Sequence, residues 1–203
     1  MPELKQRARP KLIFHPATPD RWPDFAALFG QNGACAGCWC MWWRASRADW
    51  RKGKGAGNRA AIRKIIQRGA EPGLLAYDGD RPVGWCAVAP REEYPGLGRS
   101  RVLKPVDEAA VWSVTCFFIA REYRKLGVST ALLRAAADFV RARGGRIIEG
   151  YPVEARSEMP AAWAWTGLAS AFLEAGYTEV ARRSASRPIF RRVLPARRRK
   201  DAS

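Results

Sequence analysis

A short turn between two apolar segments has the composition of a phosphate-binding site. The turn is RKLGVST (124–130), which follows the apolar run VWSVTCFFIA (111–120) and opens a helical pattern. Its basic, small and hydroxyl-bearing residues are Arg124, Lys125, Gly127, Ser129 and Thr130. A helix N-terminus offers unpaired N–H groups and partial positive charge, so a phosphate there accepts several hydrogen bonds. The spacing matches neither the Rossmann fingerprint nor the P-loop, so an ordinary strand-to-helix turn stays an alternative.

Such a turn needs a strand before it and a helix after it, and the pattern predicts both. The run 111–120 is β-branched and aromatic, and apolar enough for a central strand. Apolar residues then recur at helical spacing up to the stop at Gly144–Gly145. The segment RIIEGYPV (146–153) predicts the next strand. These three elements form a strand–helix–strand unit at the centre of the chain.

The flanking segments complete a mixed α/β sheet. An Asp-Gly pair between two apolar runs predicts a tight hairpin over 73–90. The chain from 31 to 57 and from 91 to 109 reads as irregular, and Asn58 is the expected cap of a helix. The remaining expected strands are 11–18, 177–185 and 187–194, and the remaining expected helices are 18–30, 58–69 and 161–176. The order is therefore β-α-α-β-β-β-α-β-α-β-β, a sheet that is partly antiparallel and partly parallel.

The segment CFFIAREYRKLGVSTALL resembles the acetyl-CoA motif of the GNAT superfamily of N-acetyltransferases. Arg124, Gly127 and Ser129 stand at the motif's three marker positions, and serine at the last is a small departure. The segment FLEAGYTEVARR is similar to the family's transition from its last helix into a strand, with Gly176 and Tyr177 at the Gly-Phe positions.

The resemblance covers about residues 10–195 and implies a GNAT-like α/β fold. That fold has an N-terminal strand, two helices, an antiparallel hairpin, a central βαβ cofactor unit, a last helix and two closing strands. We therefore expect one acyl-CoA N-acyltransferase domain at 11–195, a flexible N-terminus at 1–10 and a basic tail at 196–203.

The resemblance also implies the reaction. Acetyl-CoA would be the donor, CoA the product, and an amine on a small molecule or a protein would attack the thioester directly. The strand before the turn splays from the next strand in this family, and the pantetheine arm would pair with backbone near Phe118 and Ile119. The pyrophosphate would lie on the N–H groups of Lys125, Leu126, Gly127, Val128, Ser129 and Thr130.

The catalytic groups are less explicit. Many members carry a tyrosine in the last helix as general acid, and Phe172, which has no proton to give, stands at that position here. The central strand offers no carboxylate or histidine as base. Glu149 and Tyr151 on the following strand alternate with Gly150 and so share one face, which makes them the candidate catalytic residues. A structural hydrogen bond or solvent exposure is the alternative for both.

The segment CAGCWCMWWR (35–44) has the most unusual local composition. By its position in the GNAT fold it would line the acceptor site, although the rings could instead cover the edge of the core. The candidate acceptor-binding residues are Trp39, Trp42, Trp43 and Arg44. Cys35 and Cys38 have the spacing of half a zinc site and Cys40 could add a third ligand, but no second pair follows. We therefore expect no metal, and leave metal binding or redox chemistry open for these thiols.

Composition and charge limit the other classes of protein to which the chain could belong. The chain has 203 residues, 47% of them hydrophobic, with a net charge of +17 and no run long enough to span a membrane. An N-terminus without an apolar segment and five cysteines favour a cytoplasmic protein without a disulfide framework. Nine basic and no acidic residues lie between Ala181 and Lys200, so nucleic-acid binding is a competing hypothesis to a solvated surface. A catalytically inactive CoA-binding regulator and a homodimer through the last strands also stay open.

Overall fold

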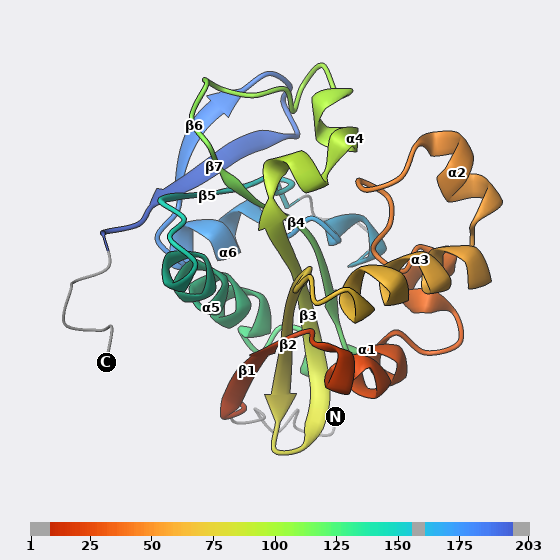
Figure 1. Ribbon diagram of the computed structural model, residues 1–203. Coiled ribbons are helices and arrows are strands. Elements are labelled where there is room, and N and C mark those ends of the chain that lie inside the picture. The colour runs from red at the N-terminus through yellow and green to blue at the C-terminus, as the bar shows by residue number, and fades with distance from the viewer. Residues whose placement is uncertain (1–8, 156–160, 197–203) are drawn as a thin grey trace, which may run out of the picture.

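The protein is described by a computed structural model covering residues 9–155 and 161–196. Within these ranges the chain forms a seven-stranded sheet in the order β1-β2-β3-β4-β5-β7-β6 (Figure 1). The strands are β1 (Leu12–Pro16), β2 (Gly73–Asp78), β3 (Arg81–Pro90), β4 (Trp112–Ile119), β5 (Ile147–Gly150), β6 (Thr178–Arg182) and β7 (Pro188–Val193). Only β4 and β5 pair in parallel. The predicted mixed sheet is confirmed.

Helices cover both faces of the sheet (Figure 1). They are α1 (Trp22–Phe29), α2 (Arg47–Lys52), α3 (Ala56–Gln67), α4 (Pro95–Gly98), α5 (Val128–Ala142) and α6 (Ala169–Glu174). α1 and α3 pack on one face, whereas α5 and α6 pack on the other. No helix in the described part of the chain combines the length and the apolar character needed to cross a bilayer.

The central strands are apolar on both faces because each face carries a core. On β3, Trp85 and Ala87 join the core under α1 and α3, whereas Cys86 and Val88 join the core under α5 and α6. This arrangement follows from the two-residue repeat of a strand. It also places β4, the next strand, between the two cores, as the sequence predicts.

The helix predicted at 161–176 is wrong in its first half. Residues Ala161–Ala164 form a 3₁₀ turn, and the α-helix begins only at Ala169. The break comes at Gly167, whose φ is +91° and whose backbone packs against the rings of Phe117 and Phe172. Here carbonyls of the chain accept hydrogen bonds from distant backbone: Trp165 from the Phe117 N–H on β4, and Gly167 from the Val153 N–H. A pattern of apolar residues alone does not show such a competing partner.

The segment 31–57 contains a helix that the sequence did not indicate, and its connection to α3 explains Asn58. The helix α2 begins after Ser46, whose hydroxyl accepts a hydrogen bond from the Asp49 N–H. α3 starts at Ala56 instead of after Asn58, so Asn58 is not its cap. The buried Asn58 amide instead donates to the carbonyls of Gly37 and Trp50 and ties the segment together.

The predicted flexible N-terminus (1–10) and basic tail (196–203) lie almost entirely outside the described residues. The boundaries of a single domain at 11–195 stay a prediction.

Gly150 provides a test of packing at the end of β5. A Cβ on Gly150 would come within 2.1 Å of the Phe172 ring, which is fully buried. We expect Gly150→Ala to lower the free energy of unfolding by about 1–3 kcal/mol, as overpacking does. Denaturant unfolding measures this effect. Gly57→Ala is the control, because its Cβ meets nothing within 4 Å in α3, and it should raise stability by about 0.5–1 kcal/mol. Equal effects would contradict the packing argument.

Candidate functional site

The turn between β4 and α5 leaves its backbone accessible. Gly127 has a φ of +79° at the N-terminus of α5, and Lys125 has a φ of +63° two residues earlier. A Cβ on Gly127 would meet nothing within 4 Å, so the space beside this peptide is open. The first N–H groups of α5 have no partner within the helix and carry the positive end of its dipole. The local geometry therefore suits an anion.

The side chains of this turn have different roles. Arg124 and Lys125 are exposed, and the Arg124 Nε donates to the Ile119 carbonyl at 3.2 Å. Val128 is buried beneath the sheet. Thr130 is buried too, and its hydroxyl donates to Glu174 at 3.1 Å. The predicted Thr130 hydroxyl donor is thus already engaged, and the remaining polar groups of the turn are its backbone N–H groups, the half-buried Ser129 and the charges of Arg124 and Lys125.

The strands β4 and β5 separate at a defined residue pair. They pair only from Trp112–Ile148 to Val114–Gly150, while β4 continues to Ile119. Past this point the Phe117 N–H faces the gap and donates to the Trp165 carbonyl at 2.6 Å. The splay that the family resemblance implies is therefore present in the described structure.

Strand alternation decides which backbone groups face this gap. The Phe117 N–H points into it and the Ala120 N–H points to β3, where it donates to the Val83 carbonyl. Ile119 therefore shares the gap edge with Phe117, whereas the backbone of Phe118 faces β3. The ring of Phe118 packs on Phe29 at a centroid distance of 5.5 Å. The sequence indicated the region but not the register, so it missed Phe117.

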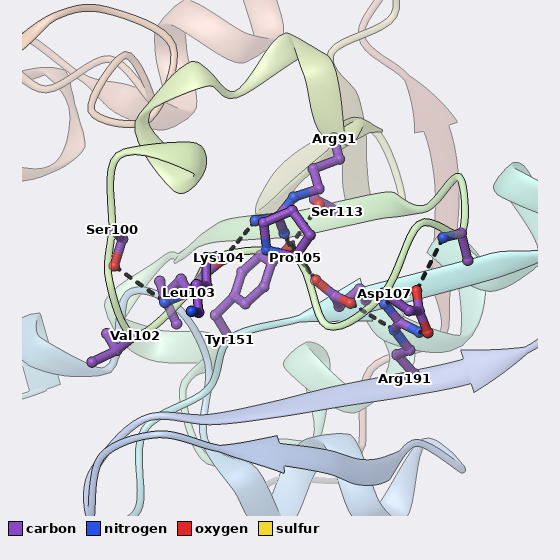
Figure 2. Close-up of polar contacts among 12 residues, drawn as sticks. Arg91, Ser100, Val102, Leu103, Lys104, Pro105, Asp107, Ser113, Tyr151 and Arg191 are labelled. Carbon is purple, nitrogen blue, oxygen red and sulfur yellow. Dashed lines mark hydrogen bonds and ion pairs between the residues drawn. The ribbon is translucent and has the colours of Figure 1, made fainter.

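Glu149 and Tyr151 lie together, as their alternation predicted, in a buried polar network. Figure 2 shows Tyr151 of this network with Arg91, Ser113 and Arg191. Both Glu149 and Tyr151 are 0% exposed. The Tyr151 hydroxyl donates to Glu149 Oε1 at 2.7 Å and lies 2.8 Å from the Ser113 hydroxyl on β4. Arg91 donates to Glu149 Oε1 at 2.9 Å, and Arg191 donates to Oε2 at 2.6 Å. Burial, reinforced by the Glu149 charge, raises the pKa of Tyr151 well above its usual range.

The comparison with known protein families identifies the family of this chain. A family model for acetyltransferases of the GNAT family matches residues 39–158, more than half of the chain. The chain belongs to the GNAT acetyltransferase family. No curated protein matches it.

Solved structures of other GNAT proteins share the fold. A GNAT acetyltransferase of Streptococcus agalactiae matches with a TM-score of 0.54 and 15% identity, over 91% of this chain and 96% of that chain. The PaiA N-acetyltransferase of Thermoplasma acidophilum, in complex with coenzyme A, matches with a TM-score of 0.52 and 11% identity, over 90% and 99%. At such identities the likeness concerns the fold alone.

In this GNAT protein, arginines fix the loop between α4 and β4 over Tyr151 (Figure 2). Arg91 donates to the Leu103 carbonyl, and Arg191 bonds both carboxylate oxygens of Asp107. The hydrogen bond from Arg191 lowers the pKa of Asp107. Arg183 adds contacts to the carbonyls of Val102, Lys104 and Pro105. Part of the C-terminal basic run is thus structural, which the count of charges did not indicate.

The predicted acceptor residues lie in different environments in the structure. Trp39 is 3% exposed and stacks with Phe29 in the core under α1. Trp42 and Trp43 are half-buried, and Trp43 lies 6.0 Å from Trp165, whose carbonyl faces the gap beside β4. Trp43 therefore lies beside this gap, Trp42 packs against the rings of Trp43 and Trp50, and Trp39 belongs to the core.

Arg44 is the last residue of the acceptor segment, which we define as residues 39–44, and its side chain reaches the turn after β3. Its side chain is 4% exposed and bonds Glu93 at 2.9 Å and the Tyr94 hydroxyl at 3.2 Å. Burial raises the pKa of Tyr94 to about 12. With Glu93 already paired to it, Arg44 is not a free cation for an acceptor.

The three neighbouring cysteines occupy different environments. Cys35 is exposed, Cys38 is half-buried and Cys40 is buried. Among the described residues, no group of three or more His, Cys, Asp or Glu side chains is arranged to hold a metal ion. The Trp85 indole N–H instead donates to the Cys40 sulfur at 3.3 Å. Cys40 and the preceding Trp39 both have positive φ, which for non-glycine residues costs about 1–3 kcal/mol each and is typical of functional sites.

The network around Glu149 has a testable energetic consequence. Glu149→Gln keeps the side-chain shape but leaves Arg91 and Arg191 without their buried counter-charge. We expect the free energy of unfolding to fall by about 3–5 kcal/mol, as for other broken buried pairs. Chemical denaturation measures it. Asp107→Asn removes a half-exposed carboxylate from the same Arg191 and should cost clearly less. Equal losses would show that burial of Glu149 does not set the cost.

Proposed function

We propose that this GNAT protein transfers the acetyl group of acetyl-CoA to an amine acceptor, on a small molecule or a protein, by direct attack, and releases CoA. The observation that carries the proposal is the open backbone at Gly127, at the N-terminus of α5 and next to the splayed edge of β4. These are the two features needed for a ligand with a pyrophosphate and an amide-bearing arm. A cytoplasmic location and a homodimer stay predictions.

The donor would be held by backbone and by a few charges. The N–H groups of Lys125 to Thr130 would bind the pyrophosphate, with Arg124 and Lys125 supplying positive charge. Phe117 and Ile119 would present the strand edge to the pantetheine amides, whereas the backbone of Phe118 faces β3. The donor supplies an activated acetyl group as a thioester. Since the Phe117 N–H now bonds the Trp165 carbonyl, a ligand reaching this position must replace that contact.

Tyr151 is the proposed proton donor to the departing thiolate. Phe172 is fully buried among aromatic rings and cannot take this role. Tyr151 follows directly on Gly150, where β4 and β5 separate, and burial keeps its phenol protonated. Glu149 would act on Tyr151 by orienting its hydroxyl. Because both Glu149 oxygens bond arginines, this carboxylate is poorly disposed to act as the general base.

The acceptor would approach from the side of Trp42 and Trp43. Trp43 packs against the cluster formed by Tyr94, Leu97 and Tyr151, and Cys40 and Met41 before it belong to the core under α1. The amine would thus reach β4 across a face different from the one on which the pyrophosphate turn lies. Arg44 would support this wall through Glu93 and Tyr94.

The donor site can be tested with two glycines at the two ends of α5. Gly127 and Gly144 have φ of +79° and +80°, and a Cβ on either meets nothing within 4 Å. Gly127→Val should abolish acetyl-CoA binding in calorimetry, because a branched side chain strains the turn and blocks approach to its backbone. Gly144→Val imposes the same strain away from the turn and should bind normally. Undiminished binding to Gly127→Val, or equal loss in both variants, would contradict the proposal.

The same proteins separate an enzyme from a CoA-binding regulator. Turnover of acetyl-CoA against a panel of amines, followed as loss of the thioester, should occur with wild type and Gly144→Val. Tight binding without turnover for every amine class would favour the regulator.

Nucleic-acid binding is the second candidate function, and α2–α3 is the surface that favours it. Eight exposed basic residues lie there, and no salt bridge joins them to acidic side chains within the described ranges. They are Arg47, Arg51, Lys52, Lys54, Arg59, Arg63, Lys64 and Arg68. The rings beneath Arg59 and Arg63, Trp22 and Trp39, are buried and cannot stack on bases.

Binding through this face would be electrostatic, so it should weaken steeply with salt. Filter binding of single-stranded and duplex DNA at low and moderate salt tests it. The double variant Arg51→Gln, Lys64→Gln should lose affinity, whereas Arg141→Gln on α5 should not. Equal binding by both variants, or none at low salt, would remove this candidate.

A further inference from the structure

An arginine close to the gap between β4 and β5 lacks an acidic partner in the described part of the chain. Arg187 lies in the connection between β6 and β7 and is half-buried. Its Nη1 donates to the Thr166 hydroxyl at 3.0 Å, and no salt bridge joins it to a carboxylate of the described residues. Other arginines around the site are each paired with a glutamate: Arg44, Arg91 and Arg191. Arg187 is thus a positive charge without a described counter-charge.

The position of Arg187 is tied to the edge of β4 that faces the gap. Its partner Thr166 directly follows Trp165, whose carbonyl accepts the hydrogen bond from the Phe117 N–H at 2.6 Å. The bond lengths across this one peptide place the Arg187 Nη1 within about 12 Å of the Phe117 nitrogen. A small molecule held by Arg187 would therefore reach the region where the thioester is proposed to lie.

Arg187 also lies on the acceptor side of the site. Trp165 is 6.0 Å from Trp43 of the acceptor segment. Trp43 packs in one cluster with Tyr151 and with Ile189, which is two residues after Arg187 on β7. The connection between β6 and β7 lies well away from the beginning of α5, where the pyrophosphate is proposed to bind (Figure 1). The charge is therefore placed for the acceptor and not for the donor.

The contact with Thr166 leaves one edge of the guanidinium unused. Thr166 is 0% exposed and binds only Nη1, so the Nε and Nη2 groups have no hydrogen-bond partner among the described residues. Two parallel N–H groups on such an edge match the two oxygens of a carboxylate. Burial lowers the pKa of Arg187, because partial removal from water disfavours its charged form. A bound anion would offset that cost.

Neighbouring cations on this side of the sheet are already engaged. Arg182, at the end of β6, pairs with Glu154 and Glu179. Arg183 donates to backbone carbonyls of the loop before β4. Among the described residues of this connection, Arg187 is therefore the arginine whose donors are available to a ligand.

We propose that Arg187 binds a carboxylate of the acceptor, so that this protein acetylates small amines that also carry a carboxylate, as free amino acids do. This inference rests on the proposed function and names its substrate class. Arg187 would hold the carboxylate through Nε and Nη2. The amine of the same molecule would then point toward the thioester beside β4, next to the ring of Trp43.

The first test uses acceptors that differ only in the carboxylate. Steady-state rates are measured with glycine, β-alanine and 4-aminobutyrate and with their carboxamides, which sample different distances between amine and anion. For at least one of these spacers, Arg187→Gln should lower the acid-to-amide ratio of kcat/KM about 10- to 10²-fold, through KM for the acid. Comparing this ratio between the variant and wild type cancels differences in amine basicity. Arg182→Gln, which removes an exposed and already paired arginine, should keep the wild-type ratio.

The second test measures binding without turnover. In calorimetry of the CoA complex, the N-acetylated acid with the preferred spacer should bind wild type more tightly than its carboxamide, and Arg187→Gln should remove this difference. The affinity for acetyl-CoA should be equal in wild type and Arg187→Gln. A loss of acetyl-CoA affinity in the variant would assign the arginine to the donor and overturn the inference.

The outcomes separate this inference from the proposed function. If wild type acetylates amines without a carboxylate but none of the amino acids, or if Arg187→Gln affects acids and amides equally, the carboxylate site is overturned and the proposed function stands. If wild type acetylates no amine at all, the proposed function is overturned and the inference with it. Should Arg187→Gln fail to fold by circular dichroism, Arg187→Lys decides, because it keeps the charge and loses the planar pair of donors. An unchanged acid-to-amide ratio in Arg187→Lys would then overturn the inference.

Discussion

The carboxylate of Glu149 is completely buried, and a buried charge is tolerated only when it is paired and hydrogen-bonded. Both of its oxygens therefore require donors, which come from Arg91 after β3 and Arg191 on β7. These arginines in turn hold Leu103 and Asp107 of the loop before β4. One charge thus links three strands and the loop that covers Tyr151. The positions of the polar side chains near the residue pair where β4 and β5 separate therefore depend on the Glu149 carboxylate.

The separation of β4 from β5 is the second organising constraint. Val114–Gly150 is their last pair, and Phe172 lies against Gly150 where a side chain would collide with it. Beyond that pair β4 no longer bonds β5, and its Phe117 N–H donates to the Trp165 carbonyl instead. Its α1-facing surface presents Cys116 to the acceptor segment. In the proposed function, donor and acceptor would meet at β4 from different directions.

Several features could be predicted because their physical causes are local. The hairpin at 73–90 follows from Asp-Gly between apolar runs, and Gly79 has the expected positive φ of +58°. The turn at Gly127 follows from glycine's freedom to adopt a left-handed conformation before a helix. Side-chain alternation placed Glu149 and Tyr151 on one face. In contrast, the helix predicted at 161–176 failed, because its first half bonds to distant backbone at Phe117 and Val153.

The sequence by itself determined the order of the seven strands, the family, and the position of the turn that suits a phosphate, since each depends on residues close together in the chain. Only the tertiary structure decided that Trp39 belongs to the core and Trp43 to the site. It also decided that Arg91 and Arg191 neutralise Glu149, and that the Trp85 indole donates to Cys40. These contacts join residues that are 42 positions apart for Glu149 and Arg191, 45 for Cys40 and Trp85, and 58 for Arg91 and Glu149. Burial, charge pairing and hydrogen bonding at such separations arise from packing of the whole sheet, which no local pattern encodes.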